Sequence, residues 1–124
     1  MRMAERKFKD SFREAGAGIW YCVVSQRNMK IHLLATIIVL IASWLLGLNP
    51  VEFALVIFAI TLVLVAEMFN TAVEKTIDLY VKTYHPGARM AKHVAAGAVL
   101  VAAINSVVIG VIVFGPHLYS LLFI

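Results

Sequence analysis

Five polar residues with the potential for chemistry follow a long apolar run without a break. They are Glu67, Asn70, Thr71, Glu74 and Asp78. At about 100° per residue, all five fall within an arc of about 100° on one helical face. Ionised carboxylates near a bilayer are costly unless they are paired, hydrated or bound to a cation. The stripe therefore points to a function rather than to packing.

The residue types in this stripe fit phosphate chemistry. Glu67 and Glu74 are about 10 Å apart along one helix face, and Lys92 follows on the next helix. One carboxylate could hold Mg²⁺ together with substrate phosphates, the other could act as a general base toward an alcohol, and Lys92 could offset phosphate charge. The chain has no glycine-rich phosphate loop, which excludes P-loop enzymes and the protein-kinase fold. Solvated charges at a helix end are the simpler alternative.

The elements that must position these residues are membrane helices. The chain has 124 residues, 62% of them hydrophobic, and a mean hydropathy of +0.90, whereas a soluble domain is about half apolar. Because a membrane span needs about 20 residues, we expect an all-α membrane protein, a single domain over residues 1–124. Its membrane helices are predicted over residues 31–48, 51–82 and 88–115, with the second and third extending into the cytoplasm.

The N-terminal segment has a different pattern. Over residues 1–29, apolar side chains such as Phe8, Phe12 and Ile19 repeat at three- and four-residue spacing, and charged residues lie mainly on the other side. This pattern predicts an amphipathic helix on the membrane surface. An ordinary cytoplasmic helix packed on protein is the alternative.

The distribution of charge predicts the orientation. The N-terminal segment is rich in Lys and Arg, and the connection before the third apolar run carries Lys82, Arg89 and Lys92. The positive-inside rule places both in the cytoplasm, and the Asn49-Pro50 turn and the C-terminus outside. The basic residues flank apolar spans as this rule expects, so we predict no nucleic-acid partner. A small membrane transporter is a rival hypothesis, but transporters usually need a carboxylate near the midplane, whereas this stripe lies toward one end.

Several sequence blocks resemble those of a known family. The string over residues 66–78, AEMFNTAVEKTID, resembles the signature of the prokaryotic diacylglycerol kinases, which are small three-span membrane enzymes that include the undecaprenol kinases of Gram-positive bacteria. Residues 25–32, 84–86 and 91–100 resemble further blocks of this family. The resemblance covers nearly the whole chain.

The resemblance implies roles for the stripe and its surroundings. Glu67 would be the catalytic base that takes the proton of the lipid hydroxyl, and Asn70 would help orient the substrate. Glu74 would bind the metal carried by ATP. The remaining ATP contacts would come from Lys92, Tyr84 and His85. The resemblance also implies a homotrimer with sites between subunits, and an N-terminal helix that helps to enclose the lipid.

Two residues depart from the family pattern at the proposed ATP–metal site. Gln26 stands where the family usually has a Glu that shares the metal with Glu74, and His93 stands where it usually has an Asp that helps organise the nucleotide site. Both changes remove negative charge. The enzyme could tolerate them, could use a different nucleotide geometry, or could be a weakly active or inactive member.

The sequence therefore predicts a kinase in the bacterial cell membrane that depends on ATP and Mg²⁺. It would transfer the γ-phosphate of ATP to the hydroxyl of a membrane lipid at the cytoplasmic surface. Undecaprenol is the favoured substrate, and diacylglycerol is the alternative. For the other histidines, we expect His32 to make a polar contact at the membrane interface rather than bind metal, and the sequence offers no partner for His117.

Overall fold

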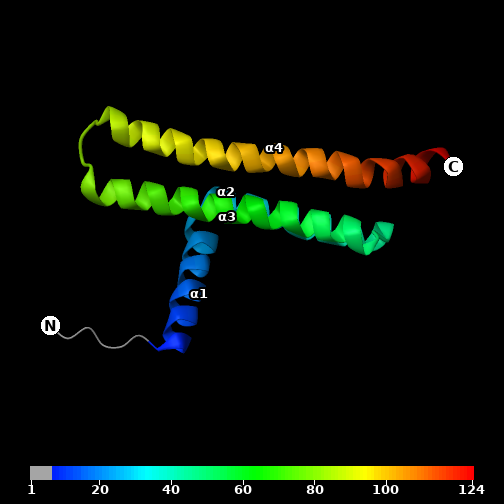
Figure 1. The fold of residues 1–124 in the computed structure, drawn as a ribbon, viewed down its shortest axis with the longest axis horizontal. Helices are drawn as coiled ribbons and strands as arrows, with labels where there is room; N and C mark the ends of the chain where they lie inside the picture. The colour runs from blue at the N-terminus through cyan, green and yellow to red at the C-terminus, as the bar shows by residue number, and fades with distance from the viewer. Residues whose placement is uncertain (1–6) are drawn as a thin grey trace.

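The computed structural model describes residues 7–124, which fold into four helices (Figure 1). The first six residues of the predicted surface helix lie outside the described part. Helices α3 and α4 form a long antiparallel hairpin, and α1 projects steeply from it (Figure 1). The helices are α1 (Phe8–Ser25), α2 (Arg27–Leu46), α3 (Pro50–Tyr80) and α4 (Pro86–Phe123).

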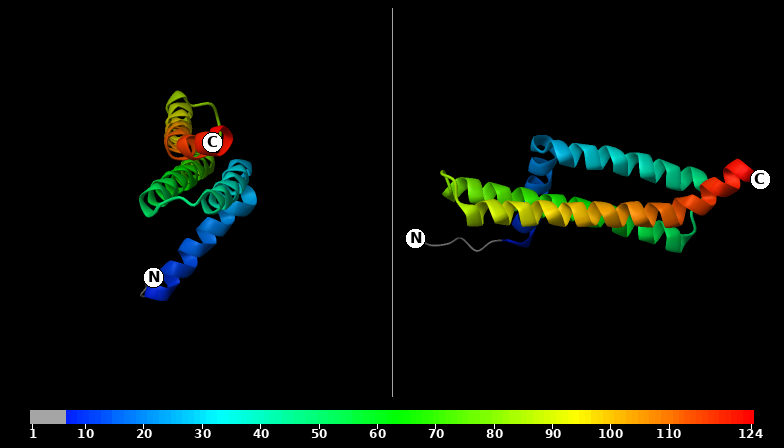
Figure 2. Two further views of the ribbon diagram at one scale, coloured as in Figure 1. Left: turned by 90° about the vertical axis from the view of Figure 1, so that its right-hand side faces the viewer. Right: turned by 90° about the horizontal axis from the view of Figure 1, so that it is seen from above.

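Helices α2, α3 and α4 are long and apolar enough to cross a membrane. Helix α2 has 20 residues, which is about the thickness of the hydrocarbon core at 1.5 Å per residue. Helices α3 and α4 have 31 and 38 residues. Their hairpin continues past the first turn of α2 (Figure 2), and the polar stripe runs from Glu67, beside His32 of α2, toward this extension.

The chain turns sharply between α1 and α2 at one residue. Gln26 has an extended backbone, with φ −105° and ψ 118°, between two helical residues. Its N–H still donates to the carbonyl oxygen of Cys22, and the Ser25 hydroxyl donates to that of Tyr21. These bonds complete the last turn of α1. The helix predicted over residues 1–29 therefore ends at Ser25, and Arg27 already begins α2.

The turn between α2 and α3 is built from residues that suit their positions. Gly47 has φ 65°, the left-handed conformation that commonly ends a helix and that glycine adopts without strain. Asn49 and Glu52 form a reciprocal capping box, with bonds of 2.8 and 3.1 Å, and Pro50 occupies the first turn, where its missing N–H costs nothing. The start of α3 is thereby fixed.

Helix α4 is longer than predicted. It continues past residue 115, through Pro116, to Phe123. Proline lacks the N–H of a helical hydrogen bond and crowds the preceding turn, and the last turns of α4 depart from the axis of the rest (Figure 2). The helix continues because most residues beyond Pro116 are again apolar and belong to no turn motif.

Candidate active site

Burial along the polar stripe decreases toward the end of α3. Glu67 is 1% exposed, Thr71 5% and Asn70 8%, whereas Glu74 is half-buried and Asp78 exposed. On the same helix, the stripe continues a buried apolar seam that includes Ala59 and Val63. The residues predicted to share one face thus run from the protein interior to its polar end.

Two oxygens of the stripe are buried without a partner. The Thr71 hydroxyl donates to the carbonyl oxygen of Glu67 at 2.9 Å, and the Asn70 amide donates to Glu74 Oε1 at 3.4 Å. Glu67 Oε2 and Asn70 Oδ1 accept no hydrogen bond from the described residues. Buried polar atoms are normally satisfied, so unpartnered acceptors on adjacent turns of one helix make this the candidate functional site.

His32 lies beside the Glu67 carboxylate. Its Nε2 atom is 3.7 Å from Glu67 Oε2, and the His32 side chain is 24% exposed, compared with 2% for that of Glu67. The sequence interpretation placed His32 in a polar contact at the membrane interface and did not pair it with Glu67. The pairing depends on how α2 packs on α3, and no spacing within one helix reveals it.

The two residues predicted to hold metal line one polar cavity. Gln26 and Glu74 share a space of about 280 Å³ with residues of α1 and α3. No cluster of three or more His, Cys, Asp or Glu side chains able to hold a metal is found in residues 7–124. One carboxylate and one amide oxygen fit Mg²⁺, which is usually held by one or two protein groups plus substrate phosphates. The other residues lining this cavity are Tyr21, Thr71, Lys75, Asp78 and Leu79.

The residues predicted to contact ATP lie at the same end of the hairpin, and they have different local roles. Lys92 forms an ion pair with Asp78, at 2.6 Å. His85 caps α4 by accepting the Ala88 N–H on its Nδ1 atom at 3.1 Å. Tyr84 is 73% exposed, and His93 is also exposed. The structure therefore brings Lys92 to the cavity edge through Asp78, and leaves the other three at the surface.

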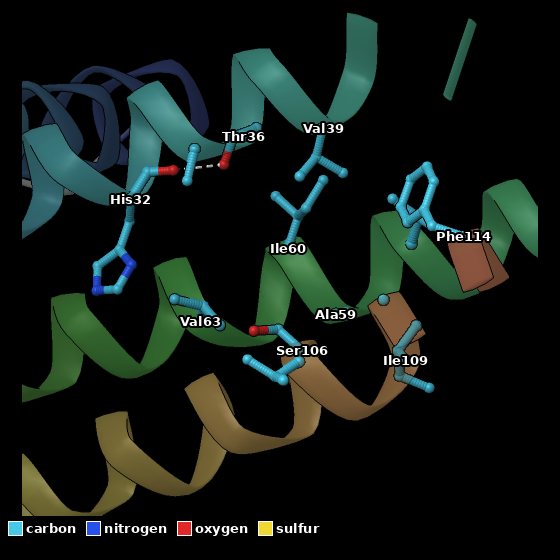
Figure 3. A pocket seen from close by; sticks show the side chains of 13 residues that line it. His32, Thr36, Val39, Ala59, Ile60, Val63, Ser106, Ile109 and Phe114 are labelled. Atoms are coloured by element: carbon cyan, nitrogen blue, oxygen red, sulfur yellow. Dashed lines mark hydrogen bonds between the residues drawn. The ribbon is translucent and has the colours of Figure 1, made fainter. Parts of the chain in front are cut away.

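An apolar groove begins at His32 and runs between the three membrane helices (Figure 3). It has a volume of about 280 Å³. His32 lies at one end and Phe114 at the other (Figure 3). The groove thus ends at His32, whose Nε2 atom lies 3.7 Å from Glu67 Oε2. Its lining includes Thr36 and Val39 from α2, Ala59, Ile60 and Val63 from α3, and Ser106 and Ile109 from α4.

The opposite end of the hairpin holds a further ionisable pair. His117 Nε2 lies 2.9 Å from Glu52 Oε2, so the histidine without a partner in the sequence interpretation has one in the fold. Glu52 and His117 lie almost equally far from residue 85 along the chain, as do Asp78 and Lys92. Both pairs follow from one antiparallel register, and counting outward from the loop would have found them.

Comparison with known proteins identifies the family. The pattern of prokaryotic diacylglycerol kinases matches residues 13–114, most of the chain. The chain belongs to the prokaryotic diacylglycerol kinase family. It is therefore a member of a family of lipid kinases, and its three long apolar helices make it a multi-pass membrane protein.

Relatives in this family carry two different names. The chain is 40% identical to an undecaprenol kinase of Bacillus subtilis, over 90% of this chain and 91% of the relative. It is 42% identical to a diacylglycerol kinase of Synechocystis, over 90% of this chain and 65% of that longer protein. The diacylglycerol kinase of Escherichia coli is 33% identical, over 64% of each chain. These identities establish the kinase family and leave the lipid open.

Proposed function

We propose that this kinase phosphorylates undecaprenol, using ATP and Mg²⁺, at the cytoplasmic face of a bacterial cell membrane. One observation carries the proposal: the buried Glu67 carboxylate lies 3.7 Å from His32, which lines the end of an apolar groove, and one helical turn from Thr71, which lines a polar cavity. A lipid kinase must bring an apolar substrate and a charged one to the same group. The near-complete coverage of the undecaprenol kinase supports the choice of lipid.

On the lipid side, the apolar tail would lie in the groove and its hydroxyl beside Glu67. Glu67 would act as the base that removes the hydroxyl proton while the oxygen attacks the γ-phosphorus. Asn70, whose Oδ1 is buried without a partner, would orient the hydroxyl. Holding the two reactants in line accounts for much of the acceleration in such transfers.

On the nucleotide side, the polar cavity would receive the phosphates of ATP. Glu74 and Gln26 would hold the Mg²⁺ that accompanies them, and this ion would neutralise phosphate charge when bound. Lys92 would exchange Asp78 for a phosphate oxygen as charge develops. Tyr84, His85 and His93, at the exposed end of the hairpin, would lie beside the nucleotide.

We also propose a membrane orientation and an oligomeric state for the chain, both as the sequence predicts. The extension of the hairpin, with its Lys and Asp pair, lies in the cytoplasm in this proposal because the Lys- and Arg-rich segments are at that end. The Glu52–His117 end is outside. The chain works as a homotrimer whose sites form between subunits, as the family resemblance implies.

The test is phosphate transfer from radiolabelled ATP to undecaprenol or to diacylglycerol in lipid vesicles. We expect wild-type protein to label undecaprenol faster. We expect Glu67→Gln to lower kcat by about 10²-fold or more, the usual contribution of a general base. Glu52→Gln is the matched control, because it removes a carboxylate from the other end of the same helix. Preferential labelling of diacylglycerol would show that diacylglycerol, and not undecaprenol, is the preferred substrate.

The same assay separates the rival hypotheses. Wild-type protein could label neither lipid, while the double variant Gln26→Glu and His93→Asp, which restores the two family residues, labels one. The chain would then be an inactive member of the family. If no variant labels a lipid, the kinase assignment fails. Full activity of Glu67→Gln would contradict the assignment of the base.

A further inference from the structure

Glu67 is poorly placed to lose a proton to water. Its side chain is only 2% exposed, and its Oε2 atom accepts no hydrogen bond from the described residues. In the function proposed above, Glu67 takes one proton from the lipid in every turnover. A base that is buried this deeply needs a second group to return it to the ionised state.

His32 is the neighbouring group that reaches solvent. Its Nε2 lies 3.7 Å from Glu67 Oε2, and its side chain is 24% exposed. Figure 3 shows the His32 ring extending from α2 toward α3 at the head of the apolar groove. The distance exceeds a hydrogen bond, but catalytic contacts are often longer without substrate.

We propose that His32 accepts the proton that Glu67 has taken from the lipid hydroxyl. This inference rests on the proposed function. The lipid O–H bond breaks as its oxygen bonds to the γ-phosphorus, the bond from the γ-phosphorus to the bridging oxygen breaks, and ADP leaves. The proton passes from the Glu67 carboxyl to His32 Nε2, and the imidazolium releases it to water. His32 acts through Glu67 and touches none of the reacting atoms.

The described residues around His32 bring few other ionisable side chains to the path of the proton from Glu67. From α3, the acidic groups on this face are Glu67 and, about two turns farther on, the half-buried Glu74. From α4, the groove residues in the described chain carry no ionisable side chain. Thr36, one turn along α2, donates its hydroxyl to the carbonyl oxygen of His32 at 2.7 Å and leaves the ring free.

The experiment compares His32→Gln with His117→Gln, which removes a histidine from the far end of the hairpin. We expect His32→Gln to lower kcat at least about tenfold while the KM values for ATP and lipid change less than about twofold. We expect His117→Gln to retain wild-type kcat. Wild-type kcat should fall on acidification, because a protonated imidazole cannot accept the proton, and His32→Gln should keep only the dependence that protonation of Glu67 imposes.

Chemical rescue separates proton acceptance from a structural role. Added imidazole should raise the kcat of His32→Ala in proportion to its neutral form, and should not rescue Glu67→Gln. Unchanged kcat in His32→Gln, an effect on lipid KM alone, or an His32→Ala protein that imidazole does not rescue would each overturn the inference. If wild-type protein labels no lipid, the proposed function fails instead. An active wild type with an unaffected His32→Gln variant overturns only the role of His32.

Discussion

At the scale of single residues, the burial of each carboxylate in the stripe decides which chemical role it can take. Glu67 is enclosed, so its charge is poorly solvated and it gains from taking up a proton. Glu74 is half-buried and lines the polar cavity, where a hydrated cation can reach it. Asp78 is exposed and already neutralised by Lys92. In the proposed function, one helical face would therefore carry a base, a metal ligand and a lysine partner in order of increasing exposure.

The first prediction concerns Gln26, which shares the polar cavity with Glu74. Gln26→Glu should lower the Mg²⁺ concentration for half-maximal activity at least about fivefold, since two unit charges about 4 Å apart already interact by about 1 kcal/mol in water and Mg²⁺ is divalent. A titration of activity with Mg²⁺ measures this, and excess EDTA should abolish the activity of both proteins.

Asn28→Asp is the matched control for this change. It adds the same charge two residues farther along, on an exposed residue of α2 outside the cavity lining. It should leave the Mg²⁺ requirement nearly unchanged. An equal effect of both variants would show that net charge, rather than a ligand at position 26, governs the response.

At the scale of helices, α1 is held to the rest by few contacts. One of them joins it to α3 beside the polar cavity: Lys75 Nζ donates to the Tyr21 hydroxyl oxygen at 2.8 Å and lies 4.8 Å from the centre of the Tyr21 ring. Tyr21 lies one turn before Ser25, whose hydroxyl bonds to its carbonyl oxygen and also accepts from the Gln26 amide at 3.4 Å. The Tyr21–Lys75 contact thus helps to set Gln26 opposite Glu74.

The second prediction is the titration of Tyr21. The hydrogen bond from Lys75 lowers the pKa of Tyr21 below its usual value. Because the folded-state pKa is depressed, the added stabilisation of the contact is present above the ordinary tyrosine value of about 10 and is lost as the pH falls through the folded-state value. Tyrosinate absorbance of wild-type protein minus that of Tyr21→Phe gives the midpoint.

Removing the ammonium group should reverse this shift. In Lys75→Gln, the Tyr21 midpoint should rise. Lys82→Gln is the control, because Lys82 bonds to the Asp78 carbonyl oxygen instead. In this variant, the Tyr21 midpoint should not change. An unshifted midpoint in Lys75→Gln would mean that the Tyr21–Lys75 contact does not form in solution.

Patterns within one helix could be predicted from the sequence, and contacts between helices largely could not. The apolar runs predicted the three membrane helices, and the spacing of Glu67 to Asp78 predicted their shared face. The helix break at Gln26 and the continuation of α4 through Pro116 depend on local backbone choices that apolar periodicity does not encode. The approach of His32 to Glu67 depends on the packing of α2 on α3, for which the sequence offers no register.

At the scale of the whole molecule, one chain leaves most of its apolar surface uncovered. In the most apolar stretches of α2, α3 and α4, only 11%, 22% and 11% of residues are buried. Trp44, Phe58 and Ile104 are among the exposed apolar residues. Lipid or other subunits must cover this surface, and in a membrane close packing rather than the hydrophobic effect selects the helix faces that associate.

The last prediction tests whether the small residues of α4, which include Gly97, form the face that packs in the proposed trimer. A Cβ built on Gly97 meets no atom within 4 Å in its own chain, so Gly97→Leu should fold. It should even gain about 1 kcal/mol of helix propensity. A neighbouring helix that approaches closely at Gly97 would instead collide with the new side chain.

Chemical cross-linking of Gly97→Leu in vesicles should then yield less trimer, and kinase activity should fall with the trimer fraction because the proposed sites lie between subunits. Val101→Leu, one turn along at a residue 68% exposed, should retain both. Undiminished cross-linking of Gly97→Leu would assign the subunit contact to another face.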